Sequence, residues 1–425
     1  MQSKSTGKVL TLVTIIFMFN YSTMAVSCCN NLFSINVPLE GYQGNREITI
    51  NSNDDVFSQL QGTWKNMSPK SAPNPRYMHA MAYDSDSDRA ILFGGNDEYS
   101  SLFNNDTWTY DYNNNTWKEI NPLISPSPRD GHRMVYDSKS DVIILFGGQV
   151  RNYSYSNETW SYNFNTNTWL NMSPVQSPTL RRDSGMVYDT KIGRTVLFGG
   201  GDGYNVYNDT WTYDFSTNNW TNLRPVISPP KRDSFAMSYD SKSDNIILFG
   251  GDYYTNFFGD TWTYNYATNV WTNMTPSISP RARALPSMAY DSEYDLTILF
   301  GGQYWFDSTS LISDTWSYDF HNDSWKEIKC AISPSPRVWH AMVYDSKLKL
   351  TILFGGALRY NNSNETWSFQ IDTGDNNNQS GKNTSTGYNI TIVQLTLASG
   401  IVICLAIGVL FIFVRKRKRR KRPKA

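Results

Sequence analysis

The chain has 425 residues, of which 15% are aromatic and only 18% are charged. So many aromatic side chains argue against both a helical bundle and a disordered chain. The formal net charge is zero, but nine of the last eleven residues are basic, and outside this tail and the first 25 residues 27 basic residues face 38 acidic ones. A body this acidic predicts no nucleic-acid partner.

The N-terminus predicts a secretory signal peptide over residues 1–25. Lys4 and Lys8 precede an apolar run at 9–19, and small residues follow up to Ala25. This order is typical of a cleaved signal. A second reading places the cut before Cys28, in a weak resemblance to a bacterial lipoprotein site. Residues 26–61 form an N-terminal extension without a match elsewhere in the chain, and we assign it no function.

Residues 62–371 carry six copies of one pattern, with a period near 52 residues. Each copy has a Met two residues before a Tyr-Asp pair, then an apolar run ending in Leu-Phe-Gly-Gly, and then acid-Thr-Trp. The second glycines of the motif are Gly95, Gly148, Gly200, Gly251, Gly302 and Gly356. Read as four short strands per copy, the pattern predicts an all-β, six-bladed propeller.

The sixth copy lacks the second tryptophan that ends the other five. That element stands at the start of the repeats, where residues 63–69 read TWKNMSP and residues 168–174 read TWLNMSP. We therefore predict that the N-terminal strand around Trp64 is the outer strand of the last blade. Closure of this kind leaves no open sheet edge.

With these glycine pairs, Tyr-Asp pairs and spaced tryptophans, residues 62–371 resemble the kelch-repeat β-propeller family, the superfamily of galactose oxidase-like proteins. The resemblance implies the propeller fold. It implies no single function, because the family includes enzymes such as oxidases and mutarotases as well as binding proteins. The copper constellation of galactose oxidase is absent from this sequence.

Residues that recur in every copy are predicted to be structural, because a single binding or catalytic site would not require the same residue in all six copies. One set is an arginine seven residues before each Tyr: Arg76, Arg129, Arg181, Arg232, Arg283 and Arg337. The other is the acid before each Thr-Trp: Asp106, Glu158, Asp209, Asp260, Asp314 and Glu365. We expect these residues to be partners within or between blades, and the six methionines to pack between blades.

Three histidines, His79, His132 and His340, share one repeat position four residues before the Tyr. Alternation along a strand places them on the same face as the Met and the Tyr, so they are expected to pack between blades rather than bind a metal. The sequence has no nucleophile elbow, zinc spacing or phosphate loop. It therefore predicts no metal site, no cofactor and no catalytic residue.

The loops between the second and third strands of each copy vary in length and content. They are rich in aromatic residues: Tyr99, Phe103, Tyr153, Tyr155, Tyr204, Tyr207, Tyr253, Tyr254, Phe257, Phe258, Tyr304, Trp305, Phe306 and Tyr360. Aromatic rings beside short polar groups suit sugars and protein surfaces, and variable loops on a rigid scaffold are the usual place for binding. The alternative is that these rings fold down onto the blades.

The C-terminus predicts a membrane anchor. A polar stalk at 372–391 is followed by 23 uncharged residues at 392–414, and a helix of about 34 Å would cross the hydrocarbon core. The basic tail at 415–425 would then lie on the cytoplasmic side, next to anionic lipid, and the propeller outside. Fifteen Asn-x-Ser/Thr sequons follow the signal, and a bridge from Cys330 to Cys28 or Cys29 is an open alternative.

We therefore predict a plasma-membrane, single-pass, non-enzymatic protein that displays the propeller for recognition of an extracellular protein or glycan. The alternative is an extracellular carbohydrate-active enzyme of the mutarotase or oxidase kind. An enzyme should bring charged residues together at one point of the loop face, whereas a binding protein should show a broad aromatic surface.

Overall fold

The structure is a computed structural model, and it describes residues 60–372 except 98–102 and 308, together with three strands of the N-terminal extension. The predicted signal peptide up to residue 24, the stalk beyond residue 372, the predicted membrane segment and the basic tail lie outside the described residues. Within the described part, no helix is long and apolar enough to cross a membrane.

The N-terminal extension contains a small antiparallel sheet. Its strands are β1 (Ala25–Cys29), β2 (Leu32–Pro38) and β3 (Asn45–Asn51), with β2 in the centre. This sheet has no counterpart in the repeats. The thiol of Cys330 is free in the structure, and the side chains of its two considered partners, Cys28 and Cys29, lie outside the described residues.

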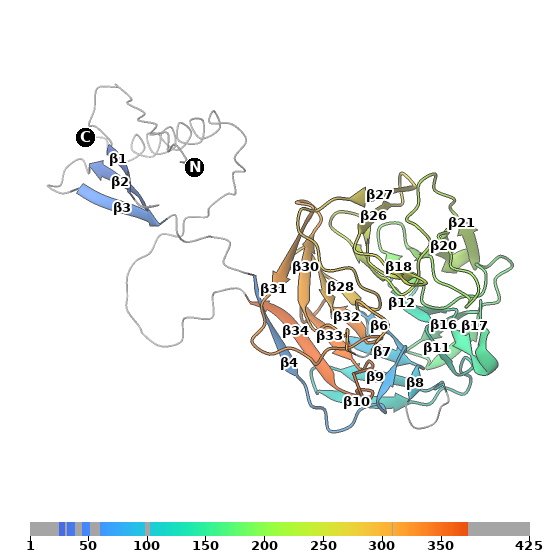
Figure 1. The fold of residues 1–425 in the computed structure, drawn as a ribbon. Helices are drawn as coiled ribbons and strands as arrows, with labels where there is room; N and C mark the ends of the chain where they lie inside the picture. Colours follow the sequence, from blue (N-terminus) through green and yellow to red (C-terminus); the bar gives the residue numbers. More distant parts are fainter. Residues whose placement is uncertain are drawn as a thin grey trace, which may run out of the picture. The chain divides into compact units, whose positions relative to one another are not determined.

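The described repeats form six four-stranded antiparallel sheets, numbered here 1 to 6 in chain order. Their innermost strands are β6 (Ala80–Asp84), β12 (Arg133–Asp137), β18 (Gly185–Asp189), β22 (Ala236–Asp240), β28 (Ser287–Asp291) and β32 (Ala341–Asp345). The second strands are β7 (Arg89–Phe93), β13 (Val142–Phe146), β19 (Arg194–Phe198), β23 (Asn245–Phe249), β29 (Leu296–Phe300) and β33 (Leu350–Phe354). Each innermost strand contacts the innermost strands of two neighbouring sheets, so the six are arranged around a common centre (Figure 1). Residues of all six strands line a pocket there, which is called the channel.

The outer half of each sheet completes the propeller. The third strands are β9 (Thr107–Asp111), β16 (Thr159–Asn163), β20 (Thr210–Asp214), β26 (Thr261–Asn265), β30 (Thr315–Asp319) and β34 (Thr366–Asp372). The outermost strands are β10 (Thr116–Ile120), β17 (Thr168–Asn171), β21 (Asn219–Asn222), β27 (Val270–Met274), β31 (Ser324–Ile328) and β4 (Gln61–Asn66). The predicted all-β propeller is thus confirmed.

Short strands and turns lie at the ends of the sheets. The strands are β5 (Arg76–Tyr77), β8 (Asn96–Asp97), β11 (Arg129–Asp130), β14 (Gln149–Val150), β15 (Ser154–Tyr155), β24 (Asp252–Tyr253) and β25 (Asn256–Phe257). Two 3-10 turns, η1 (Arg151–Tyr153) and η2 (Phe215–Thr217), accompany them.

The burial of the strands explains their sequences. All five residues of β13 are buried, as expected for an apolar run that lies between two other strands and two neighbouring sheets. In the outermost β17, only Trp169 is buried, and its neighbours along the strand are exposed. The Gly-Gly pair then leaves each second strand with positive φ, 73° and 99° at Gly147 and Gly148, where a side chain would be strained.

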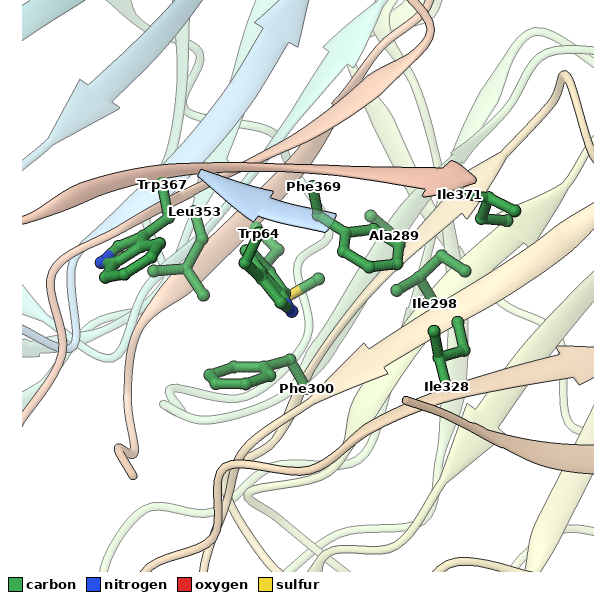
Figure 2. Packing of buried hydrophobic residues seen from close by; sticks show 10 residues of the cluster. Trp64, Ala289, Ile298, Phe300, Ile328, Leu353, Trp367, Phe369 and Ile371 are labelled. Atoms are coloured by element: carbon green, nitrogen blue, oxygen red, sulfur yellow. The ribbon is translucent and has the colours of Figure 1, made fainter. Parts of the chain in front are cut away.

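The strand around Trp64 pairs with the third strand of sheet 6. Antiparallel β4 and β34 place Trp64 opposite Phe369, and the Trp64 ring packs on Phe369 and on Phe300 of sheet 5 (Figure 2). The indole Nε1 of Trp64 donates a 2.9 Å hydrogen bond to Thr315 Oγ1 in sheet 5. The N-terminal end of the repeats therefore joins the last two sheets.

A series of five backbone hydrogen bonds connects the six sheets at one mouth of the channel. In each sheet the residue two positions after the repeated arginine has a φ between 54° and 62°. These residues are Met78, Gly131, Asp183, Ser234, Leu285 and Trp339. The N–H of Met78 donates to the C=O of Trp339. In the same way the N–H groups of Gly131, Asp183, Ser234 and Leu285 donate to the C=O groups of Met78, Gly131, Asp183 and Ser234, respectively. Bulky residues with left-handed φ persist only where the surrounding structure fixes them.

Candidate functional site

Each repeated arginine pairs with the acid of its own sheet. Arg181, fully buried, donates from Nη1 to Asp209 Oδ1 at 2.6 Å and from Nη2 to Oδ2 at 2.9 Å. Burial alone would raise the pKa of Asp209, but the hydrogen bonds from Arg181 hold it below its usual value. The other pairs are Arg76–Asp106, Arg129–Glu158, Arg232–Asp260, Arg283–Asp314 and Arg337–Glu365. They tie the start of each innermost strand to its third strand.

The three histidines pack between sheets. Each lies edge-on to a phenylalanine of the neighbouring sheet, with ring centroids 5.4 Å apart for His79 and Phe354 and 5.5 Å apart for His132 and Phe93. His340 contacts Phe300 in the same way. Burial, followed by repulsion from Arg76, lowers the pKa of His79 to about 3. Among the described residues, no cluster of His, Cys, Asp or Glu is arranged to hold a metal ion.

We expect His79→Phe to make the protein less sensitive to acid. Because the folded chain holds His79 neutral down to about pH 3, whereas an unfolded histidine binds a proton near pH 6.5, the free energy of unfolding falls as the pH is lowered through this window. Phenylalanine occupies the same repeat position at Phe235. The loss of stability between pH 7 and pH 5, measured by urea unfolding, should be about 2 kcal/mol smaller in the variant. Equal losses would contradict this assignment.

The loops between the second and third strands lie on the same face as the crossovers between sheets, and this face is called the loop face. Ser177 Oγ in one crossover donates to Asn157 C=O in a loop at 3.0 Å, and Ser279 Oγ does the same to Gly259 C=O at 3.2 Å. The turns within the first and last strand pairs lie at the opposite ends of the strands. The third strand of sheet 6 runs away from the loop face toward Asp372.

The predicted aromatic loop residues divide into two groups. Tyr204, Tyr254, Trp305, Phe306 and Tyr360 are exposed, with 87, 58, 58, 51 and 79% of their surface accessible. The half-buried group is Phe103, Tyr155, Tyr207, Tyr253, Phe257, Phe258 and Tyr304. Tyr99 and the side chain of Tyr153 lie outside the described part.

Part of the half-buried group stabilises the scaffold. Tyr207 and Phe258 lie 4.3 and 4.1 Å from the guanidinium carbons of the buried Arg181 and Arg232, a stacking contact that favours the charged arginine. Tyr304 lies 3.6 Å from the guanidinium carbon of Arg281, an exposed residue of the crossover. Tyr207 and Phe258 thus fold onto the sheets, which is the alternative that the sequence left open.

The exposed aromatic residues form a strip over sheets 3 to 6. The Tyr254 hydroxyl donates to Tyr204 C=O at 3.3 Å, which joins the loops of sheets 3 and 4. Phe306 packs on Phe257 with centroids 4.6 Å apart, which joins sheets 4 and 5. Tyr360 borders a groove of about 360 Å³ between the loops of sheets 5 and 6. We call Tyr204, Tyr254, Trp305, Phe306 and Tyr360 the aromatic strip.

Two features of the loop face were missed in the sequence analysis. The first is a rim of exposed aliphatic residues on the crossovers: Leu123, Ile124, Val175, Val226, Ile227, Ile278 and Ile332. The recurring Ile-Ser-Pro at 124–126, 227–229, 278–280 and 332–334 was a signal for it.

The second feature is a group of charged residues at the channel mouth. Arg182, Asp183, Asp233 and Asp252 line one cavity there. Behind them Asp130 is 2% exposed, and burial together with repulsion from Asp183 raises its pKa to about 7. The sequence analysis did not identify these positions, because their proximity depends on pairing between segments that are distant in sequence.

Fold and surface together define a β-propeller that presents variable loops on one face. The family model "KLHDC2/KLHL20/DRC7 Kelch-repeats domain" matches residues 123–290 and 224–386, and the model "Attractin/LZTR1 beta-propeller" matches residues 41–200. The chain therefore belongs to the kelch-repeat β-propeller family, whose members generally bind other proteins.

Similar curated proteins are larger than this chain. Leucine-zipper-like transcriptional regulator 1 homolog of Drosophila melanogaster is 25% identical over 310 residues, which are 67% of this chain and 30% of that protein. Mei4-dependent protein 6 of Schizosaccharomyces pombe is 24% identical over 196 residues (40% and 27%). The flagellar outer arm dynein alpha chain of Chlamydomonas reinhardtii is 25% identical over 313 residues (67% and 7%). The chain thus spans less than a third of each of these relatives.

Proposed function

We propose that this protein is a single-pass cell-surface receptor or adhesin whose six-bladed propeller binds an extracellular protein or glycan through its loop face. The observation that carries the proposal is the aromatic strip, which spans four neighbouring loops, three of them joined by direct contacts, and leaves large rings exposed. Rigid aromatic side chains lose little entropy on binding and supply much of the energy of interfaces.

The orientation of the propeller supports display away from the cell. Since β34 ends at Asp372 on the side opposite the loop face, a stalk that continues from there toward a membrane anchor directs the aromatic strip outward. The apolar segment at 392–414 supports the assignment of a membrane anchor, and the basic tail after it supports a cytoplasmic C-terminus. In this topology exposed sequon residues such as Asn66 and Asn171 carry glycans.

The topology is tested on cells that express the full chain. An antibody against the propeller should stain intact cells, one against the tail should stain only permeabilised cells, and removal of N-linked glycans should increase the mobility of the protein on a gel. Staining of the propeller only after permeabilisation would contradict the proposal.

Recognition by the aromatic strip is tested with the double variant Tyr254→Ser/Trp305→Ser. Both side chains are 58% exposed, so the melting temperature should change by less than about 2 °C while binding to surface proteins and glycans falls at least about tenfold. Leu170→Ser, an equally exposed substitution on the outermost strand β17, is the matched control and should bind normally. Retained binding, or a collapse in melting temperature, would show that the strip is not the recognition surface.

A second candidate function, a carbohydrate-active enzyme, is favoured by the charged residues that converge at the channel mouth. Carboxyl groups with separated pKa values are a common basis of acid–base chemistry on sugars. Turnover of monosaccharides or oligosaccharides that is lost in Asp252→Asn would favour this candidate over binding alone.

A further inference from the structure

A cavity of about 230 Å³ opens at the mouth of the channel on the loop face. Its two sides differ in chemistry. One side presents Asp183, Asp233 and Asp252 beside Arg182, and the other presents Met78, Leu285, Phe306 and Trp339. The indole Nε1 of Trp339 is buried and has no hydrogen-bond partner among the described residues. The cavity thus combines an acidic side with an apolar, aromatic side.

Two of the carboxylates are adjacent because of backbone pairing. Asp233 N–H donates to Asp252 C=O at 3.1 Å, and Asp252 N–H donates back to Asp233 C=O at 3.0 Å. Residues that exchange both hydrogen bonds in an antiparallel pair have Cα atoms about 5.5 Å apart and side chains on the same side. Both side chains line the cavity, and Asp252 is 8% exposed. Two acids therefore lie next to each other in a largely buried place.

The scaffold does not require this acid pair. The equivalent backbone pairs in the other sheets are Tyr77 with Asn96, Asp130 with Gln149, Arg182 with Gly201, Ala284 with Gln303, and Val338 with Ala357. Only sheet 4 has two acids, although all six described positions have the same backbone pairing. A feature that one sheet carries and five omit is better explained by a ligand than by folding.

The nearby cations are already engaged elsewhere. Arg182 contacts Asp183 at 3.3 Å and Asp130 at 4.0 Å, and Arg133 contacts Asp183 at 3.9 Å. In the described part of the chain, no lysine or arginine forms an ion pair with Asp233 or Asp252.

Within the residues that the structure describes, the pair has no direct ion-pair partner, and the nearby charges of Arg182 and Arg133 offset it only in part, by lowering the pKa of Asp233. The Ser234 hydroxyl donates to Asp233 Oδ1 at 2.9 Å and also lowers the pKa of Asp252 by hydrogen bonding. Asp202 in the adjoining loop is held by its own loop amides and by the Tyr207 hydroxyl. Burial, and then repulsion between neighbouring acids, raises the pKa of both Asp252 and Asp233. The pair therefore gains negative charge at a higher pH than ordinary carboxyl groups do.

We propose that this cavity receives an arginine side chain presented by a partner protein, with its guanidinium on Asp233 and Asp252 and its aliphatic stem against Leu285, Phe306 and Trp339. A guanidinium supplies several donors in a planar fork that matches carboxylates and also stacks on aromatic faces. The aliphatic part of an arginine side chain is stabilised by apolar contacts while its guanidinium stays paired with the carboxylates. The inference rests on the proposed function and names the chemistry of the partner.

The test uses the full chain and two peptides, acetyl-Gly-Arg-Gly-amide and the same peptide with neutral citrulline in place of arginine. Binding is measured by saturation-transfer NMR titration. We expect the arginine peptide to bind at least tenfold more tightly than the citrulline peptide at pH 8. Its affinity should fall several-fold at pH 6, because protonated carboxyl groups no longer attract the cation.

Substitutions separate the acid pair from other charges. Asp233→Asn and Asp252→Asn should each lower the affinity for the arginine peptide at least tenfold. The control is Asp307→Asn, which replaces an exposed acid on the loop of sheet 5 and should change the affinity less than twofold. Neither cavity variant should lower the melting temperature at pH 8, because asparagine keeps the shape of the side chain and removes the repulsion between neighbouring carboxylates. Equal binding of both peptides, no binding of either, insensitivity to both substitutions, or a fall in melting temperature would each overturn the inference.

The same experiments distinguish this inference from the proposed function. If partner binding depends on Tyr254 and Trp305 but the arginine peptide does not bind, the inference fails and recognition by the loop face stands. If the arginine peptide binds through Asp233 and Asp252 but no partner responds to the aromatic strip, the wider proposal fails instead.

Discussion

Replacing Trp64 by alanine is expected to lower the free energy of unfolding by about 3–5 kcal/mol, the range for truncation of a large buried aromatic residue. Trp64 is 2% exposed, packs on Phe300 and Phe369, and donates to Thr315 in the neighbouring sheet. The substitution therefore removes contacts within sheet 6 and between sheets 5 and 6. Urea unfolding of the full chain measures the loss.

Trp220→Ala provides the matched control, since Trp220 occupies the same position in sheet 3 and donates to Thr159 in sheet 2. Both variants should lose similar stability. Only Trp64→Ala, however, should reduce the hydrogen-exchange protection of the amides of β34. Trp64 lies on β4, which comes from the other end of the repeats and is the outer hydrogen-bonding partner of β34. If Trp64→Ala lowers the free energy of unfolding by less than about 1 kcal/mol, or leaves the hydrogen-exchange protection of β34 unchanged, then β4 does not hold the ring closed.

Substitution of Asp209 by asparagine is expected to cost about 3–5 kcal/mol of stability, because it leaves the charge of Arg181 buried and unpaired. Arg181 is fully buried and reaches both oxygens of Asp209, and the Trp211 indole donates to Oδ2 as well. One substitution therefore disturbs several hydrogen bonds at the start of one sheet. The free energy of unfolding near pH 7 is the measurement.

An exposed ion pair at the end of the outermost strand β31 is the control. Lys329 and Glu327 lie 2.5 Å apart, and their side chains are 56% and 39% exposed. Since exposed pairs contribute little, Glu327→Gln should cost less than about 1 kcal/mol. Similar losses in the two variants would contradict the view that burial makes the repeated arginine–acid pairs structural.

Features written into every repeat could be predicted from the sequence. The arginine–acid partners, the tryptophan missing from the last copy and the histidines between sheets follow from equal spacing and strand alternation alone. The packing of His132 on Phe93 is one example. The arginine–acid pair makes the same contact in every sheet, so six copies give one consistent signal.

Features found in one sheet could not be predicted in this way. Asp233 and Asp252 are 19 residues apart, and they meet only because a bridge pairs them. Tyr207 and Phe258 occupy loops like Tyr204 and Tyr254, yet the first two stack on buried arginines and the others stay exposed. The path of the backbone through each loop, rather than residue type, determines which aromatic ring is available for binding.

The measurement that most directly tests the account is a map of where a partner touches the propeller on living cells. A photo-cross-linking phenylalanine analogue is placed at Tyr204 or Tyr360 on the loop face, or at Asn113 or Asn165 in exposed turns at the opposite end of the strands. We predict cross-links to an extracellular protein from Tyr204 and Tyr360 and none from the two asparagine positions. Cross-links from Asn113 or Asn165 alone would show that the other face carries recognition.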